Sequence, residues 1–251
     1  MTLAHDVTGS GPAVLLLHSM VCDRRMWSPQ VAALSAAGFR VIRCDLGGFG
    51  ESPLPAGPYD DAGDVVALLD SLGVPSAAVV ASSGSGPVAA EVAARWPSRV
   101  PALVLVCSAL PGWPPSPARQ AFAGQEDALL ASGDITAATE LNLRTFVGPA
   151  AGDAARLLVR DMQRHIFEVQ LSADEPEAIE VPWEFASITA RTLVVSGDLD
   201  LPDFPAIADE LARRIPGASR ARLQWAGHLP SLEDPSRFDP LLLGFLLDAA
   251  R

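Results

Sequence analysis

The sequence is poor in cysteine and in basic residues, and each shortage excludes a class of protein. Its three cysteines, Cys22, Cys44 and Cys107, form neither a disulfide framework nor a metal-binding spacing. Such cysteine usage is typical of a reducing compartment, so we expect a cytoplasmic protein. Lys and Arg together number 18 against 30 Asp and Glu, a formal net charge of −12. This charge repels a phosphate backbone or an anionic membrane surface, so we expect neither as a partner.

Long hydrophobic runs and cofactor-binding loops are also missing, and we expect no leader segment. Residues 1–6 contain no basic region, and the apolar run at 14–17 is too short for a signal peptide. No apolar run reaches the roughly 20 residues that a membrane helix needs. No Gly-x-Gly-x-x-Gly loop follows a predicted strand with an acidic partner downstream, which argues against a dinucleotide cofactor. We therefore expect no metal, no cofactor and no membrane partner, and the sequence carries no signal of an oligomeric state.

What the sequence does contain is an alternation of apolar strand-like runs and amphipathic helices. With 251 residues and 49% hydrophobic residues, it has the size and the core of an α/β domain. The alternation predicts an α/β fold: a mainly parallel, doubly wound sheet with helices on both faces. The last predicted strand spans 220–225 and the last helix 238–249. Between 111 and 182 the pattern is helical only, with predicted helices at 120–132, 135–146 and 151–171.

A Ser- and Gly-rich turn between a strand-like run and an Ala-rich helical run contains the candidate nucleophile. A strained turn of this kind requires small residues close to the nucleophile, and Ser83 meets that requirement on both sides. Ser82 has the β-branched Val80 behind it, and Ser85 has Pro87 ahead of it, where the helix has already begun. We therefore prefer Ser83. The alternative interpretation is a loop that binds nothing, or a phosphate.

A serine hydroxyl needs a base, and the base needs an acid that orients it. His228 follows a Gly in a loop directly after the last predicted strand, and we prefer it as the base. Of the other histidines, His5 is near the N-terminus, His18 closes a strand and His165 lies on a predicted helix of the 111–182 segment. A structural or solvated role is the expectation for these three as bases, and His165 is also a candidate for the wall of the substrate pocket.

Together these features resemble the lid-bearing α/β-hydrolase superfamily. The family's Gly-x-Ser-x-Gly motif is replaced here by Ala-x-Ser-x-Ser-Gly around Ser83. The resemblance implies that 111–182 is a helical lid inserted into a core formed by 1–110 and 183–251. The family pattern Gly-x-x-Asp selects Asp200 over Asp198, which would instead cap local backbone. The resemblance thus implies Ser83, Asp200 and His228 as catalytic residues, with the backbone N–H groups of Met20 and Gly84 as the oxyanion hole.

Residues 18–30 resemble more narrowly the 3-oxoadipate enol-lactonase-like branch, which implies a small ester or lactone as substrate. We therefore predict a serine hydrolase acting on a small molecule. Two alternatives remain open: a cofactor-free perhydrolase or C–C bond hydrolase with the same three residues, and a ligand-binding or receptor protein on the same fold. The predicted pocket residues are Ser19, Trp113, Met162, His165, Phe204 and Leu229.

Overall fold

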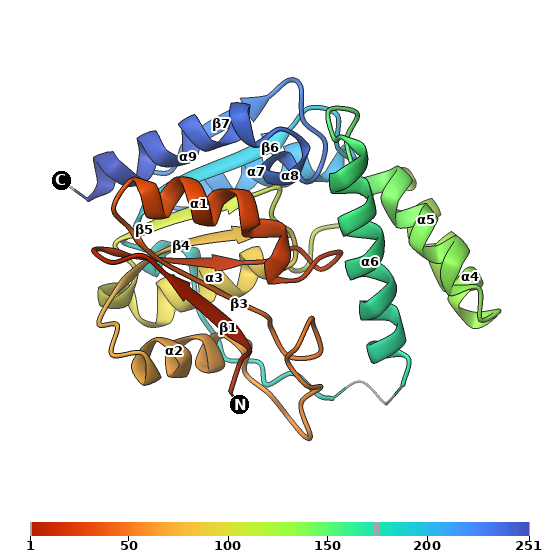
Figure 1. Cartoon of the computed structure of the whole chain (residues 1–251), viewed down its shortest axis with the longest axis horizontal. Coiled ribbons are helices and arrows are strands. Elements are labelled where there is room, and N and C mark those ends of the chain that lie inside the picture. Colours follow the sequence, from red (N-terminus) through yellow and green to blue (C-terminus); the bar gives the residue numbers. More distant parts are fainter. Residues whose placement is uncertain (1, 173–175, 251) are drawn as a thin grey trace.

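A seven-stranded sheet runs through the middle of the molecule (Figure 1). The computed structural model describes residues 2–172 and 176–250. Among the described strands, β1 alone runs antiparallel to its neighbour, so the predicted mainly parallel sheet is confirmed. In spatial order the strands are β1 (His5–Thr8), β3 (Arg40–Cys44), β2 (Ala13–Leu17), β4 (Ala77–Ser82), β5 (Ala102–Val106), β6 (Arg191–Gly197) and β7 (Ser219–Leu223).

Helices cover both faces of the sheet, as the doubly wound pattern predicts (Figure 1). One apolar layer is completed by α2 (Asp61–Ser71), α3 (Ser85–Arg95) and α7 (Asp203–Arg214). The opposite layer is completed by α1 (Ser28–Ala36) and α9 (Pro235–Ala249). Short helical segments connect these elements: η1 (Arg24–Trp27), η2 (Pro97–Arg99), η3 (Phe185–Ser187) and α8 (Pro230–Glu233).

The side chains of the central strands alternate between these two apolar layers. In β2, Leu15 and Leu17 belong to the layer of α2 and α3, whereas Val14 and Leu16 belong to the layer of α1 and α9. All four are fully buried. Because successive strand residues point to opposite faces, a strand covered on both faces appears in the sequence as an unbroken apolar run.

Three helices separate β5 from β6 in the sequence and lie at one end of the sheet (Figure 1). These helices, here called the helical insertion, are α4 (Pro117–Ala131), α5 (Ile135–Phe146) and α6 (Asp153–Gln170). Helix α6 buries Val159, Met162 and Ile166 in the core, whereas α4 has no buried side chain. The division of the chain into a core and a lid at 111–182 stays a prediction, and residues 173–175 of that segment lie outside the described residues.

Four element ends differ from the sequence-based prediction by two or three residues, and one of them is the start of α6, at Asp153 instead of 151. Helix α4 begins at Pro117 because the Ser116 side chain accepts the N–H of Arg119 and caps it. Helix α9 begins at Pro235 and not at 238, since proline is compatible with the first turn of a helix. Strand β7 ends at Leu223 instead of continuing to 225, because the chain turns there.

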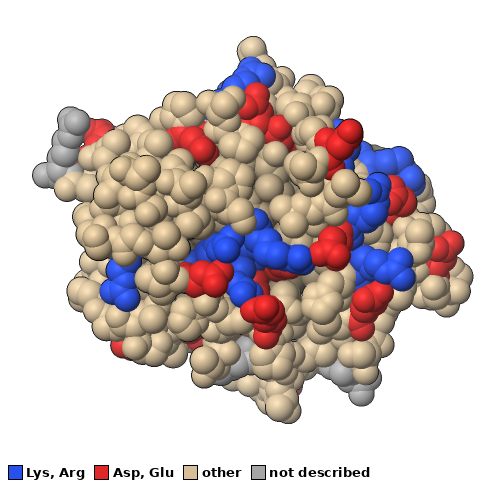
Figure 2. Space-filling model, viewed as in Figure 1, with Lys and Arg blue, Asp and Glu red and all other residues tan. Residues whose placement is uncertain are grey.

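Charged side chains on the face shown in Figure 2 are interleaved, with acidic groups beside a band of basic ones. Among the ion pairs of the structure, Arg24 pairs with Asp6 and Asp45, and Arg43 pairs with Asp6. Basic groups of this kind are engaged by neighbouring carboxylates and do not form an open cationic surface. Across residues 2–172 and 176–250, no helix combines the length and apolar character of a membrane span.

Candidate active site

Ser83 occupies the sharp turn between β4 and α3, with a backbone φ of 58°. Non-glycine residues rarely adopt this left-handed conformation, so the turn is strained and must be held by its surroundings. The Ser83 N–H donates to the C=O of Val106 at 2.9 Å. The Ser83 C=O accepts the N–H groups of Gly86 at 3.0 Å and Ala109 at 2.9 Å. The end of β5 and the first turn of α3 therefore fix the backbone that presents the hydroxyl.

Two glycines next to Ser83 are required by close packing. A Cβ atom on Gly84 would lie 2.4 Å from Cγ of Met20. A Cβ atom on Gly86 would lie 1.9 Å from Oγ of Ser108. Because Cβ contacts in proteins do not come this close, only glycine fits at either position without displacing a neighbour. The small residues that the sequence pattern required after the nucleophile thus have a packing reason.

The three serines of the turn have different surroundings. The Ser85 hydroxyl donates to the C=O of Ser82 at 3.0 Å. The Ser82 hydroxyl is buried and has no hydrogen-bond partner among the described residues. Ser83 Oγ lies 2.8 Å from Nε2 of His228. Of the three serines, Ser83 is therefore the one whose hydroxyl meets an imidazole.

His228 follows β7 and connects Ser83 to a carboxylate. Its ring is 1% exposed, and its Nδ1 lies 2.7 Å from Oδ2 of Asp200. Asp200 follows β6, its side chain is fully buried, and its Oδ1 accepts the Leu201 N–H at 2.7 Å. Because an ionised carboxylate only accepts hydrogen bonds, Nδ1 carries the proton and Nε2 is left to accept from the Ser83 hydroxyl. The structure thus brings the three predicted residues together at the carboxyl ends of β4, β6 and β7.

The alternative acid and the strand-closing histidine are engaged elsewhere. Asp198 forms an ion pair with Arg222 at 3.1 Å. His18 is fully buried: its Nδ1 lies 2.9 Å from the C=O of Ser19, and its Nε2 accepts the Leu46 N–H at 3.0 Å. Burial lowers the pKa of His18, and the neutral ring is the form that satisfies both hydrogen bonds. His18 therefore holds two loops together.

Glu233 is a site residue to which the sequence analysis assigned no role. It is 4% exposed; its Oε2 accepts the Gly227 N–H at 2.7 Å and its Oε1 accepts the Leu229 N–H at 2.9 Å. These two amides flank His228, so one carboxylate fixes the loop on both sides of the imidazole. Burial raises the pKa of Glu233. The sequence feature that could have indicated this role is an acidic residue shortly after the Gly-His pair.

The two amides predicted as an oxyanion hole belong to residues that line one cavity with Ser83. That cavity, here called the Ser83 cavity, has a volume of about 400 Å³, and Met20 and Gly84 are both part of its wall. Among the turn, loop and cap hydrogen bonds of the described residues, neither the Met20 N–H nor the Gly84 N–H is a donor. Gly84 also precedes α3, where the helix dipole is positive. These positions suit the predicted role, which stays a prediction.

Of the six predicted pocket residues, Phe204 lines the Ser83 cavity, and its ring centroid lies 4.2 Å from that of His228. Ser19, Met162 and Leu229 are fully buried in the packing around the cavity and do not line it. Trp113 packs against the apolar layer of α2 and α3 instead. The wall also includes residues that the sequence analysis did not assign, among them Arg119, Phe122, Phe146, Gln163 and Phe167.

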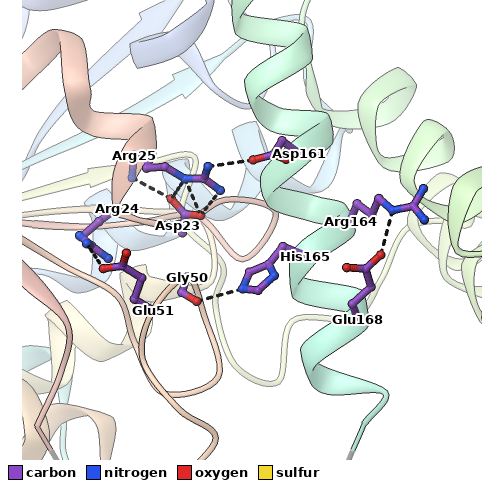
Figure 3. Close-up of a pocket in the computed structure, with 9 residues that line it drawn as sticks. All are labelled: Asp23, Arg24, Arg25, Gly50, Glu51, Asp161, Arg164, His165 and Glu168. Carbon is purple, nitrogen blue, oxygen red and sulfur yellow. Dashed lines mark hydrogen bonds and ion pairs between the residues drawn. The ribbon is translucent and has the colours of Figure 1, made fainter.

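His165 lies in a different hollow, here called the second cavity, of about 460 Å³ between η1, the loop at 50–51 and α6 (Figure 3). Its Nε2 lies 3.0 Å from the C=O of Gly50. Arg25 pairs there with Asp23 and with Asp161, each at 2.8 Å. The expectation that His165 lines the substrate pocket is therefore corrected: it joins α6 to a loop of the core.

Cys107 lies close enough to Asp200 and His228 that one ligand atom from each falls within 4.8 Å of the others. Both ring nitrogens of His228 already have partners, at 2.7 Å and 2.8 Å. A metal ion here would have to displace Ser83 or Asp200 from the imidazole. Hydrogen bonding therefore explains this cluster better than metal binding does.

A strand–turn–helix that presents a buried serine to a His and an Asp on later strand ends defines a class of α/β enzymes. Residues 14–240 match the family model described as the alpha/beta hydrolase family. The chain therefore belongs to the alpha/beta hydrolase family, and the superfamily resemblance drawn from its motifs is confirmed.

Individual relatives span almost the whole chain. A protein of Azorhizobium caulinodans named "Putative carbamate hydrolase RutD" is 30% identical over 97% of this chain and 94% of its own length. The solved enol-lactonase from Burkholderia xenovorans LB400 has a TM-score of 0.79 and 28% identity, covering 98% of this chain and 96% of that one. A thermophilic esterase from Thermogutta terrifontis has a TM-score of 0.78 and 26% identity, covering 98% and 93%. These similar proteins all have names that denote hydrolysis.

Proposed function

We propose that the protein is a serine hydrolase that cleaves a small carboxylic ester or lactone through an acyl-enzyme on Ser83. The observation that carries the proposal is the pair of hydrogen bonds that joins Ser83 to His228 at 2.8 Å and His228 to Asp200 at 2.7 Å. A hydroxyl, an imidazole and a carboxylate in this order are the groups that make a serine nucleophilic.

In the acylation half of this proposal, Ser83 Oγ forms a bond to the substrate carbonyl carbon while its proton moves to Nε2 of His228. Asp200 keeps the imidazole oriented and stabilises the imidazolium that results. The N–H groups of Met20 and Gly84 stabilise the negative charge that develops on the carbonyl oxygen. The bond to the leaving oxygen then breaks, and His228 returns the proton to that oxygen, which leaves an ester on Ser83.

In the deacylation half, a water molecule replaces the departed alcohol. His228 takes a proton from the water, whose oxygen attacks the acyl carbon, and the same imidazole then protonates Ser83 Oγ as the acyl bond breaks. The rings of Phe146 and Phe204, with centroids 4.9 Å and 4.2 Å from that of His228, limit the access of bulk water to the imidazole. In this proposal the segment 111–182 acts as the lid, because its three helices contribute to the cavity wall.

The size of the substrate is bounded by the Ser83 cavity. A volume of about 400 Å³ lies at the small end of the range for ligand sites, which favours a small molecule. An ester or lactone substrate is favoured by the enol-lactonase and the esterase among the similar structures. The carbamate hydrolase among the relatives makes carbamates worth including in a substrate panel.

The test is covalent labelling with a fluorophosphonate together with hydrolysis of p-nitrophenyl acetate. We expect the wild-type protein to be labelled at Ser83 and to turn over the ester, and the S83A variant to do neither. Labelling or hydrolysis that persists in S83A would remove Ser83 from the mechanism. A single burst of labelling without steady turnover would instead favour a ligand-binding protein on this fold. Peroxide-dependent halogenation or cleavage of a vinylogous diketone would identify the perhydrolase or C–C hydrolase alternative.

A further inference from the structure

Gln163 is a buried polar side chain on a helix face that is otherwise apolar. It lies on α6, lines the Ser83 cavity and is 3% exposed. The other buried residues of α6 are apolar: Val159, Met162, Ile166 and Phe167. Within the described residues, Oε1 of Gln163 has no hydrogen-bond partner. A buried carboxamide oxygen without a partner costs free energy, and a residue that violates a local preference in this way is typical of a functional site.

The other polar groups of the cavity wall do not supply the missing donor. The Asn142 amide uses both of its hydrogens, on the Glu126 carboxylate and on a backbone carbonyl of α5. The Arg119 guanidinium contacts an aromatic ring, and in the described part of the chain no hydrogen bond joins it to Oε1 of Gln163. The donor for this oxygen must therefore belong to a molecule that enters the cavity.

Gln163 lies on the acyl side of the cavity. The sulfur of Met162, the preceding residue, accepts the Asp23 N–H at 3.4 Å, so this turn of α6 packs against the loop that follows β2. In the proposed mechanism that loop binds the carbonyl oxygen, whereas the leaving oxygen lies next to Nε2 of His228, whose ring contacts two phenylalanine rings. A group of the substrate that reaches Gln163 therefore belongs to its acyl part.

The charges of the cavity wall favour a neutral donor. A carboxylate has no hydrogen to donate, so it would leave Oε1 of Gln163 unsatisfied, and it would share the cavity with the Glu126 carboxylate. An ammonium group could donate, but it would share the cavity with the Arg119 guanidinium. An amide N–H or a hydroxyl satisfies the oxygen and brings no charge into the cavity.

We propose that Gln163 determines substrate specificity, with its Oε1 accepting a hydrogen bond from the acyl part of the substrate. The substrate class is then an ester or lactone whose acyl part carries a neutral donor, an amide N–H or a hydroxyl. A site that accepts such a bond discriminates against the analogue without the donor, because its buried acceptor then stays unpaired. This inference rests on the proposed ester or lactone hydrolysis and adds to it the group that the acyl part carries.

The test uses two pairs of ethyl esters, and in each pair a donor is replaced by a group of similar size. The amide pair is ethyl N-acetylglycinate and ethyl 4-oxopentanoate, in which CH₂ replaces N–H. The hydroxyl pair is ethyl 3-hydroxybutanoate and ethyl 3-methylbutanoate, in which CH₃ replaces O–H. A pH-stat measures kcat/KM for each ester, and the ratio of donor ester to partner is compared between proteins, so that intrinsic reactivities cancel.

Q163M removes the acceptor and keeps the approximate volume of the side chain. We expect it to lower the ratio of at least one pair about three- to thirtyfold, the value of one hydrogen bond to a buried acceptor. Q163E keeps an oxygen acceptor and loses the NH₂ group, so it should keep the preference for the donor ester. Q170M is the matched control on the same helix: Gln170 also lines the cavity but is exposed, so water satisfies its amide.

The inference is overturned if Q163M keeps both wild-type ratios, or if Q170M lowers them as much as Q163M does. A lower unfolding temperature of Q163M with unchanged ratios would show that Gln163 has a structural role instead. If no ester is hydrolysed, the proposed function fails, and calorimetric titration with the same esters decides this inference separately. Binding of a donor ester that is at least about threefold weaker in Q163M, with its partner unaffected, then supports the inference. Titrations that are the same for Q163M and the wild type contradict it.

Discussion

The two cavities on either side of helix α6 have similar volumes, about 400 Å³ and 460 Å³, but their polar groups are used differently. Gln163 and Ile166 on one face of α6 border the Ser83 cavity, whereas Asp161 and His165 on another border the second cavity. In the second cavity the charged side chains are paired, as Arg25 is with Asp161 (Figure 3). In the Ser83 cavity, within the described residues, the Arg119 guanidinium has a ring contact with Phe204 but no ion pair, and Oε1 of Gln163 has no hydrogen-bond partner.

If the proposed function is located in the Ser83 cavity, the volume of a cavity is a poorer guide to function than polar groups without partners. A ligand entering the second cavity would have to compete with ion pairs that already satisfy its polar groups. A ligand entering the Ser83 cavity would meet a hydroxyl that is hydrogen-bonded to His228, and a carboxamide oxygen that gains its first partner. Substitutions on the two sides of α6 should therefore have very different consequences for turnover.

The largest expected effect is that of removing the imidazole. H228A should lower kcat for p-nitrophenyl acetate by a factor of about 10⁴ to 10⁶, because the Ser83 hydroxyl loses the base that takes its proton. Steady-state kinetics on the purified variant measures this loss, and circular dichroism confirms that it is folded. Retention of more than one-tenth of the wild-type kcat would show that Ser83 is not activated by His228.

The next largest effect is expected at the acid. D200N should lower kcat by about 10⁴, because an amide at this position no longer fixes the proton on Nδ1 of His228. D198N is a suitable control: it removes one carboxylate nearby, but Asp198 pairs with Arg222 and has no contact with the imidazole. We expect D198N to keep kcat within about twofold. The reverse ranking of the two variants would assign the acid to Asp198.

A smaller effect is expected at Glu233, which binds the two amides that flank His228 and does not line the Ser83 cavity. E233Q replaces one of two accepting oxygens by an NH₂ group, so one of the Gly227 and Leu229 amides loses its acceptor. We expect kcat to fall about tenfold with little change in KM, as follows from a small misplacement of the base. An unchanged kcat would show that the loop around His228 is fixed without this carboxylate.

The ionisation of Glu233 provides a second measurement on the same variant. Its pKa is raised by burial, so the folded state keeps its proton at pH values where the unfolded state has lost it. Wild-type stability should therefore decrease as the pH rises from the ordinary value of 4.5 through the raised pKa, and E233Q should lack this decrease. Urea unfolding of both proteins across this interval measures the difference. Parallel pH profiles would contradict it.

The part of the site that could be predicted from the sequence consists of features encoded locally. The turn at Ser83 is indicated by its small neighbours, and Asp200 and His228 lie in the loops that follow β6 and β7, so all three converge at one sheet edge. The cavity wall could not be predicted in this way. Met162 and His165 were expected to line the pocket, but Gln163 and Ile166, one position along, line it instead. Successive residues of an α-helix point in directions about 100° apart around its axis, and only tertiary packing decides which of them faces the cavity.

The smallest effect is expected in the second cavity, where a substitution should leave turnover at Ser83 unchanged. D161N removes one ion pair of Arg25, whose guanidinium remains bound to Asp23. Both partners of the lost pair are well exposed, at 43% and 69%, so the unfolding free energy should fall by less than about 1 kcal/mol. Turnover of p-nitrophenyl acetate should stay within about twofold, because α6 keeps its buried contacts and Gln163 stays in place. A large loss of kcat in D161N would mean that this ion pair sets the position of α6 over Ser83, and the two cavities would then have to be treated as one coupled site.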